Sequence, residues 1–312
     1  MERKVVGLLK LALKYQVTDI YFEEKNDQVS ISMKVKEEVR KLKPHADDLM
    51  FFQYLQYRAN LDVGNFFKPQ TGQFEVEVEG KLVSCRFALL NSYKITSGVL
   101  RFLNQSQLVG LEGLTLDSEV IDFFRKISEM ETGLVLLTGP TSSGKTTALY
   151  AILKEITGKK IFTLEDPIEV VQENMVQVQI NEKQHLGYDE GIKQLMRHHP
   201  DIIMIGEIRD SVAAKMAVRC ALTGHLVISS LHAPSAALAI ERMLELGVAR
   251  TQLFDVLEGV SNQRLLMTRK RGKKGFYELM RKEDIERYAK GEKSVYIPLD
   301  EKLARAKEAG IL

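Results

Sequence analysis

Nine residues in the middle of the chain, Gly139–Thr147, have the types and the spacing of a phosphate-binding loop. They read GPTSSGKTT and connect an apolar run to a helix-prone segment. Backbone N–H groups in a Gly-rich turn that leads into a helix form a cradle for phosphate, and Gly139 and Gly144 lack the Cβ atoms that would obstruct it. At this spacing Lys145 reaches the β- and γ-phosphates, while the Thr146 hydroxyl binds Mg²⁺. The predicted nucleotide contacts are Gly139, Pro140, Thr141, Ser142, Ser143, Gly144, Lys145, Thr146 and Thr147.

An acidic residue that could act with this loop follows the apolar run Ile202–Ile205. The run is followed by Gly206 and Glu207, and Gly206 stands where proteins with a phosphate loop often have Asp. Asp201 precedes the run, and an extended strand separates it from Glu207 by about 20 Å. Glu207 is therefore expected to hold the metal or its water, and a strand-end ion pair with Arg209 is the alternative.

A second acidic cluster, Glu165–Glu169, follows the next apolar run after the loop and reads EDPIE. Three carboxylates around a proline form a rigid, electronegative turn that can hold a hydrated metal and an attacking water. Glu169, and after it Glu165, are the candidates to orient that water. The alternative is an acidic surface turn without a chemical role, because turns of this composition are common.

Two histidines flank the apolar segment LVISSL: His225 lies before it and His232 after it. An extended chain separates them by about 23 Å, so both cannot contact one phosphate. His232 follows the carboxyl end and is the candidate to sense the γ-phosphate, with a structural role as the equal alternative. For His225 a structural or interfacial role is expected.

The elements that position these residues alternate between strand and helix patterns from Leu134 onward. The expected strands are 134–138, 161–164, 202–205 and 226–230, and the expected helices begin at Lys145, near Tyr188 and at Val212. This order predicts an α/β domain with a mostly parallel sheet covered by helices. Ligands of such sheets bind beyond the carboxyl ends of the strands, where the candidate acids and His232 lie.

The first hundred residues have a different pattern. Period-two alternation predicts strands at 29–35 and 74–78, further strands follow at 81–90 and 98–103, and helical spacing occurs at the start and at 46–59. These elements predict a small α+β domain. The predicted organisation is an N-terminal domain at 1–103, a linker at 104–113, a nucleotide-binding domain at 114–266, and a basic loop with a helical tail at 267–312.

Composition limits the class of protein. The 312 residues are 45% hydrophobic and 28% charged, with a net charge of +2. These values are ordinary for a soluble globular protein and give no global attraction to nucleic acid or anionic lipid. The apolar runs are far shorter than the roughly 20 residues that span a bilayer. Two cysteines cannot form a zinc site unaided, and a cytosolic location is the simplest interpretation.

Four segments in this order resemble the Walker A, Asp-box, Walker B and His-box motifs of the type II secretion/type IV pilus assembly ATPases. They read GPTSSGKTT, LEDPIE, DIIMIGEIRD and TGHLVISSLH. LDVGNFFKPQTGQF at 61–74 and NQRL at 262–265 add to the resemblance, which covers about 61–266. The segment LMRHHPD and the short tail look most like the traffic ATPases of Gram-positive competence pseudopili.

The resemblance implies a RecA-like P-loop NTPase domain, preceded by a PAS-like α+β domain, in a homohexamer that binds ATP and Mg²⁺. In that family arginines of the N-terminal domain reach the nucleotide, and Arg86 and Arg101 are the matching positions here. Ordinary surface arginines in salt bridges are the alternative. Gln73 stands where relatives often have another arginine, so a third such role is not assigned. Zinc is not expected, because no cysteine follows Cys220 to build the four-cysteine module of many relatives.

By this resemblance the chain is a cytoplasmic motor, peripheral at the inner face of the cell membrane, that hydrolyses ATP to assemble a competence pseudopilus for DNA uptake. Its expected partner is a polytopic inner-membrane platform protein, and direct nucleic-acid binding is not expected. The basic segment Arg269–Gly275 is either a solvated loop or a contact to anionic lipid or to the platform protein. The alternatives are a type II secretion or pilus-retraction motor, a nucleotide-gated scaffold with little turnover, and a small-molecule kinase.

Overall fold

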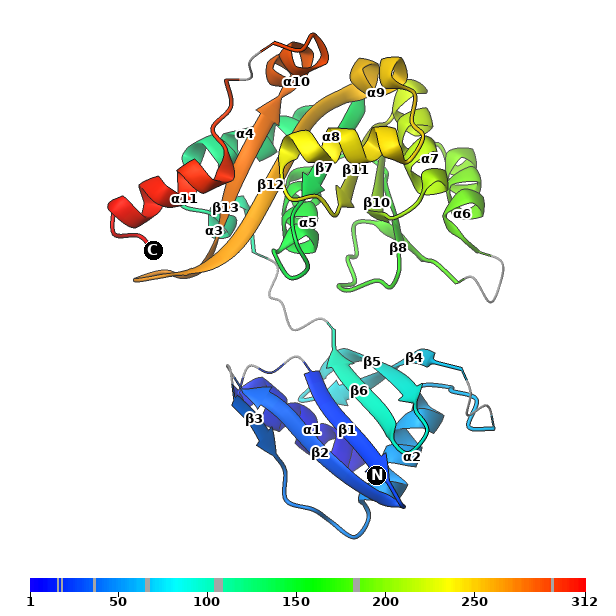
Figure 1. Ribbon diagram of the computed structural model, residues 1–312. Coiled ribbons are helices and arrows are strands. Elements are labelled where there is room, and N and C mark those ends of the chain that lie inside the picture. The colour runs from blue at the N-terminus through cyan, green and yellow to red at the C-terminus, as the bar shows by residue number, and fades with distance from the viewer. Residues whose placement is uncertain are drawn as a thin grey trace. The chain divides into compact units, whose positions relative to one another are not determined.

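The chain folds into two compact units, Met1–Gln107 and Leu108–Leu312, in a computed structural model (Figure 1). The structure describes residues 1–15, 17, 19–35, 38–64, 68–103, 109–181, 186–292 and 295–312. No helix in these ranges has both the length and the apolar character that crossing a membrane requires. Each unit has a sheet and a hydrophobic core of its own.

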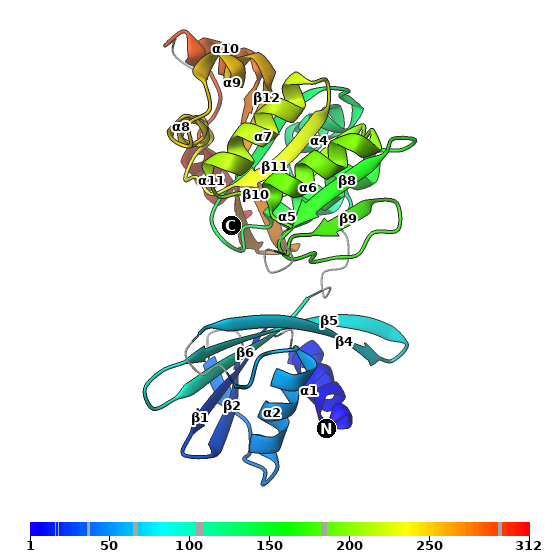
Figure 2. The same cartoon turned by 90° about the vertical axis from the view of Figure 1, so that its right-hand side faces the viewer.

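The first unit is an antiparallel sheet with two helices. Its elements are α1 (Glu2–Tyr15), β1 (Asp19–Lys25), β2 (Gln28–Val35), β3 (Glu38–Lys41), α2 (Asp48–Arg58), β4 (Gln70–Val78), β5 (Lys81–Asn91) and β6 (Thr96–Phe102). The six strands lie in the order β3-β2-β1-β6-β5-β4. Alternating apolar residues turn one face of the sheet toward both helices (Figure 2). Phe22 lies inside this core, with its ring centroid 5.8 Å from that of Phe52 and 5.9 Å from that of Phe87.

The second unit is a seven-stranded sheet between two layers of helices. Its strands are β7 (Gly133–Thr138), β8 (Ile161–Glu165), β9 (Val176–Gln179), β10 (Ile202–Ile208), β11 (Leu226–Leu231), β12 (Leu257–Thr268) and β13 (Gly272–Arg281). Its helices are α3 (Leu111–Leu114), α4 (Ser118–Glu129), α5 (Lys145–Glu155), α6 (Tyr188–Leu195), the 3₁₀ turn Met196–His198, α7 (Ser211–Leu222), α8 (Ala236–Glu245), α9 (Arg250–Val256), α10 (Lys282–Ala289) and α11 (Leu299–Glu308). The strand order is β13-β12-β7-β11-β10-β8-β9, and only β13 runs antiparallel to its neighbour.

Helices cover both faces of this sheet. Along β7, Leu134 and Leu136 pack on one face with α6, α7 and α8, while Val135 and Leu137 pack on the other with α4 and α5. β7, β8 and β11 are buried along their whole length, as expected of parallel strands between two helical layers. Because these strands and β10 are parallel, the loops that follow them all leave from one edge of the sheet.

The predicted fold class is confirmed: a RecA-like P-loop α/β unit follows a small PAS-like α+β unit. Two boundaries differ from the prediction. Residues 104–108 of the predicted linker lie outside the described residues, and 111–113 belong to α3. The predicted boundary at 266/267 falls inside β12, and the predicted loop Arg269–Gly275 holds the turn of the β12–β13 hairpin and the start of β13. Charged neighbours on both sides concealed the buried stretch 277–280 of β13 in the sequence.

One buried carboxylate on β13 joins two helices of the second unit. Glu278 is 3% exposed, and its Oε1 accepts a hydrogen bond of 2.8 Å from the backbone N of Ala236, the first residue of α8. Its Oε2 accepts one of 3.0 Å from the backbone N of Leu299, the first residue of α11. Both contacts place a carboxylate at a helix N-terminus, where the free N–H groups and the helix dipole favour negative charge.

Replacement of Glu278 by alanine is expected to lower the free energy of unfolding of the second unit by about 3 kcal/mol, because two buried N–H groups lose an ionised acceptor. Urea unfolding followed by circular dichroism measures this change. Glu278→Gln should fall between the wild type and Glu278→Ala. Glu286→Ala, an exposed site on α10, is the control and should leave the midpoint unchanged. Equal midpoints for the Glu278 and Glu286 variants would contradict the double-cap role.

Candidate nucleotide-binding site

The loop between β7 and α5 has a backbone that requires its glycines. Gly139 has φ 139° and Gly144 has φ 90°, and Ser142 also has a positive φ of 62°. A Cβ on Gly139 would lie 2.5 Å from the backbone O of Gln263, closer than a Cβ can approach a fixed backbone atom, and 2.8 Å from Ser143 Oγ. Gly144 is the N-cap of α5 in the left-handed region. The loop therefore has the turns that its glycines predict, and it leads into the N-terminus of α5, an arrangement that can receive phosphate.

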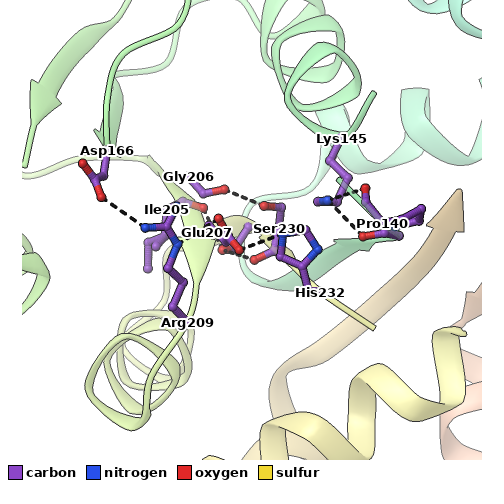
Figure 3. Close-up of polar contacts among 11 residues, drawn as sticks. Pro140, Lys145, Asp166, Ile205, Gly206, Glu207, Arg209, Ser230 and His232 are labelled. Carbon is purple, nitrogen blue, oxygen red and sulfur yellow. Dashed lines mark hydrogen bonds and ion pairs between the residues drawn. The ribbon is translucent and has the colours of Figure 1, made fainter. Parts of the chain in front are cut away.

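Lys145 is the first residue of α5 and is 8% exposed. Its Nζ donates hydrogen bonds of 3.0 Å to the backbone O of Gly139 and 3.0 Å to that of Pro140, so the ammonium lies inside the loop (Figure 3). Burial lowers the pKa of Lys145, and the negative charges of Glu207 and Glu169 only partly oppose this shift. A buried ammonium with incomplete compensation is a strong binding group for a polyanion.

Residues of β12 support the loop from behind. Gln263 is 1% exposed, and its Nε2 donates a hydrogen bond of 2.8 Å to the backbone O of Ser143. The Nδ2 of Asn262 donates to Thr138 Oγ1 and to the backbone O of Ala233, both at 2.9 Å. Asn262 thereby joins the end of β7 to the segment that follows β11. In the sequence these residues stand out only as part of a family motif, although three consecutive uncharged polar residues in a mostly apolar segment are the signal of their role.

Replacement of Gln263 by alanine is expected to weaken ATP binding about tenfold, because the buried carbonyl of Ser143 loses its donor and the loop loses one support. Isothermal titration calorimetry with Mg·ATP measures the affinity. A melting curve measures the accompanying loss of stability. The matched control is Met267→Ala, at an exposed position of the same strand, with unchanged affinity. An unchanged affinity in Gln263→Ala would show that the loop holds its shape without β12.

Glu207, near the carboxyl end of β10, lies at the centre of a chain of ion pairs (Figure 3). Its Oε1 lies 3.0 Å from His232 Nε2, and its Oε2 accepts a hydrogen bond of 3.0 Å from Arg209 Nε. Arg209 NH1 continues to Asp166 Oδ2 at 3.2 Å. Although partial burial alone would lower it, the pKa of Arg209 is raised by Glu207 and Asp166. The ion pair with Arg209 that was an alternative to metal binding is thus present, and Glu207 still keeps a fifth of its side chain exposed.

The structure separates the two candidates for orienting water. Glu165 is buried, and its carboxylate accepts hydrogen bonds from Tyr150 OH, Thr163 Oγ1 and Gln177 Nε2. Glu169 is exposed, and its charge acts on Lys145. Glu169 therefore has access to solvent near the loop, while the protein itself occupies both oxygens of Glu165.

The residues present fit a magnesium ion. Mg²⁺ takes oxygen ligands, keeps several waters, and is bound by one or two protein groups together with substrate phosphates. Thr146 supplies a hydroxyl beside Lys145 in the first turn of α5, and Glu207 supplies a carboxylate whose charge also acts on Lys145. Among the described residues no group of three or more His, Cys, Asp and Glu side chains could form an all-protein metal cage. These two side chains agree with a Mg²⁺ ion that is bound partly by the protein and partly by phosphate oxygens of the nucleotide.

Three further candidate residues remain: Arg86 and Arg101 lie in the first unit, and His225 lies in the second. Arg86 on β5 is the direct cross-strand neighbour of Arg101 on β6, so both side chains lie on one face of the first unit's sheet. Arg101 Nε donates a hydrogen bond of 2.6 Å to Asp19 Oδ1. In the second unit His225 Nδ1 lies 3.1 Å from the backbone O of Cys220, which agrees with the structural role expected for it.

Comparison with known proteins gives the family. The family model described as "Type II/IV secretion system protein" matches residues 1–294. "Competence protein ComGA" of Bacillus subtilis (strain 168) is 32% identical over 271 residues, which are 85% of this chain and 76% of that protein. "Putative type II secretion system protein E" of Escherichia coli (strain K12) is 32% identical over 269 residues, 85% of this chain but only 55% of that protein. The chain thus spans little more than half the length of this second relative.

Solved structures agree on the fold. The pilus retraction motor PilT with bound ADP aligns with a TM-score of 0.77 and 22% identity over 99% of this chain and 94% of PilT. The ATPase DotB of Legionella pneumophila aligns with a TM-score of 0.75 and 19% identity over 97% of this chain and 91% of DotB. With its phosphate loop, its acidic strand ends and these matches along nearly its whole length, the chain belongs to the type II/IV secretion system protein family, as one of its ATPases.

Proposed function

We propose that this chain is the cytoplasmic, homohexameric ATPase that powers assembly of a competence pseudopilus for DNA uptake. The observation that carries the proposal is the buried ammonium of Lys145 within the loop, with the charges of Glu207 on β10 and of Glu169 in the segment after β8 acting on it. A triphosphate would supply the charge compensation that Lys145 lacks. Relatives named ComGA in Bacillus subtilis and Streptococcus pneumoniae, at 32% and 34% identity, support the competence assignment.

The proposed roles follow from the positions of the side chains. Gly139–Thr147 bind the phosphates, and Lys145 neutralises the β- and γ-phosphates. Mg²⁺, held by Thr146 and Glu207, would neutralise charge on the phosphate oxygens. Glu169 orients the attacking water, and His232 senses the γ-phosphate through its contact with Glu207. Glu165 remains the second candidate for the water by sequence, but its three hydrogen bonds favour Glu169.

Arg86 and Arg101 are proposed to reach the bound nucleotide from the first unit. An arginine at the γ-phosphate can raise turnover by roughly three to five orders of magnitude. Their neighbouring positions on β5 and β6 support a joint role. Movement of the first unit would then be coupled to hydrolysis, as a motor requires. A polytopic platform protein at the inner face of the membrane is the proposed partner, with peripheral membrane association and no direct contact to nucleic acid.

Two measurements on the purified chain test the enzymatic part. Steady release of phosphate from Mg·ATP, together with a six-subunit mass by light scattering, is the expected result. Binding of ATP without turnover would instead favour a nucleotide-gated scaffold. Transfer of the phosphoryl group to a small molecule by a monomer would favour a kinase.

Deletion of the gene in the source organism tests which machine this ATPase powers. Loss of transformation with normal secretion and twitching is expected. The relative named type II secretion system protein E has the same 32% identity as the Bacillus ComGA, so a secretion motor is the second candidate. Loss of secretion alone would favour it, and hyperpiliated, non-twitching cells would favour a retraction motor.

A further inference from the structure

A buried polar network connects the helix of the phosphate loop to two strands at the edge of the sheet. Glu165, the last residue of β8, is 3% exposed, and Tyr150 of α5 is 1% exposed. Glu165 Oε2 accepts the hydroxyl of Tyr150, and its Oε1 accepts bonds from Thr163 Oγ1 at 2.7 Å and Gln177 Nε2 at 3.1 Å. Burial raises the pKa of Tyr150, and the adjacent Glu165 raises it further.

Gln177 on β9 extends the network to the segment that carries Glu169. Its Nε2 also donates to the backbone O of Val170 at 2.9 Å, and its Oε1 accepts from the backbone N of Gln172 at 2.6 Å. One amide thus holds a carbonyl and an N–H on the far side of Glu169. The segment 166–175 has no regular secondary structure, and its described backbone–backbone hydrogen bonds outside helices and strands are limited to Met175 N to Gln172 O.

A buried carboxylate paired with a half-buried amide would be a poor choice if packing were their only role. Desolvation of such groups costs free energy that an apolar pair of the same volume would avoid, and a fully satisfied network instead specifies one geometry. Here the fixed parts are α5, which begins at Lys145, and the turn that bears Glu169. The network reaches α5 at Tyr150 and the carbonyl of Val170, the residue after Glu169, and the negative charge of Glu169 raises the pKa of Lys145 against the effect of burial.

We propose that Tyr150 and Gln177 are positioning residues, which act through Glu165 and the backbone of Val170 to hold Glu169 in register with Lys145. The inference rests on the proposed function, since it assigns a purpose to the position of Glu169 in ATP hydrolysis. In this proposal Glu165 stabilises the turn that carries Glu169 and does not orient the attacking water. A water-orienting group displaced by about 1 Å loses roughly a hundredfold in rate, while nucleotide contacts made by the loop are unaffected.

The test uses the full chain with Gln177→Met, which keeps the volume and removes the amide, and Tyr150→Phe, which removes only the hydroxyl. Both variants should lower kcat about tenfold or more, with KM and ADP affinity within about threefold of the wild type. Gln194→Met is the matched control, since the side chain of this exposed glutamine on α6 donates to Glu190, in its own helix, and lies outside the network. A purely structural network would lower the melting temperature without this split between kcat and KM.

Hydrogen–deuterium exchange gives a readout that does not need turnover. In Gln177→Met the amides of 166–175 should exchange faster, while those of α5 remain protected. Unchanged exchange in this segment, an unchanged kcat in both folded variants, or an equal loss of ADP affinity would each overturn the positioning role. If the wild-type chain releases no phosphate while Gln177→Met still exchanges faster than the wild type in 166–175, the proposed function is overturned. The network then only holds the turn in place.

Discussion

Replacement of Lys145 by alanine is expected to abolish ATP binding at micromolar concentrations and to leave no steady phosphate release. The ammonium lies within the loop on two backbone carbonyls, and burial already lowers its pKa. A charge-assisted contact to phosphate from such a position is among the stronger polar interactions in proteins. A loss of about 100-fold or more in affinity, equal to about 2.8 kcal/mol, is expected. Calorimetric titration with Mg·ATP measures it.

The control for this variant is Lys154→Ala. Lys154 lies in the last turn of the same helix, α5, and is exposed. It shares the charge and helix of Lys145 but not its place in the loop, so affinity and turnover should stay at wild-type values. Circular dichroism should show that both variants fold. ATP affinity in Lys145→Ala within about threefold of wild type would remove the basis of the nucleotide site.

The sequence was sufficient where chemistry depends on local spacing. The phosphate loop, the strand before Glu207 and the helix that starts at Lys145 are each encoded within about ten consecutive residues, and the sequence predicted all three, although the strand continues through Glu207 to Ile208 instead of ending at Ile205. The parallel sheet followed from the alternation of these elements, because strands joined by helices must run in the same direction. Residues at the ends of such strands then meet at one edge, which brought Glu207 and His232 together.

Contacts between segments that are distant in the sequence could not be predicted from local patterns. Gln263 bonds a carbonyl 120 positions away, and the hairpin β12–β13 adds to the sheet beside β7 through the pairing of β12. Neither follows from periodicity, because β12 mixes buried polar and apolar residues and β13 begins with a basic run. The same limit applies to Glu165, whose type and position fit a catalytic acid equally well. Only its three donors reveal that the carboxylate is turned into the protein.

Replacement of Glu207 by glutamine is expected to separate binding from hydrolysis. Glutamine keeps the volume and can still meet His232 and Arg209, which now contact the two carboxylate oxygens. It removes one negative charge near a site for a polyanion, so ATP affinity should be unchanged or tighter. The lost charge is the one that would hold the metal and its water, and roughly a 100-fold to 1,000-fold fall in kcat is expected for loss of one group that stabilises charge in the transition state. Phosphate release and calorimetry on the same preparation measure the two effects.

Comparison of Glu207→Gln with Lys145→Ala distinguishes a role of Glu207 in hydrolysis from a role in nucleotide binding. Both residues lie in one electrostatic site, since the charge of Glu207 acts on the pKa of Lys145. If Glu207 served mainly to hold the loop or to stabilise the ammonium, its neutral variant would lose ATP affinity as Lys145→Ala does. Glu155→Gln, at the exposed end of α5, controls for the loss of one carboxylate and should change neither quantity. Retained affinity with lost turnover in Glu207→Gln alone therefore assigns this carboxylate to the hydrolytic step and Lys145 to capture of the nucleotide.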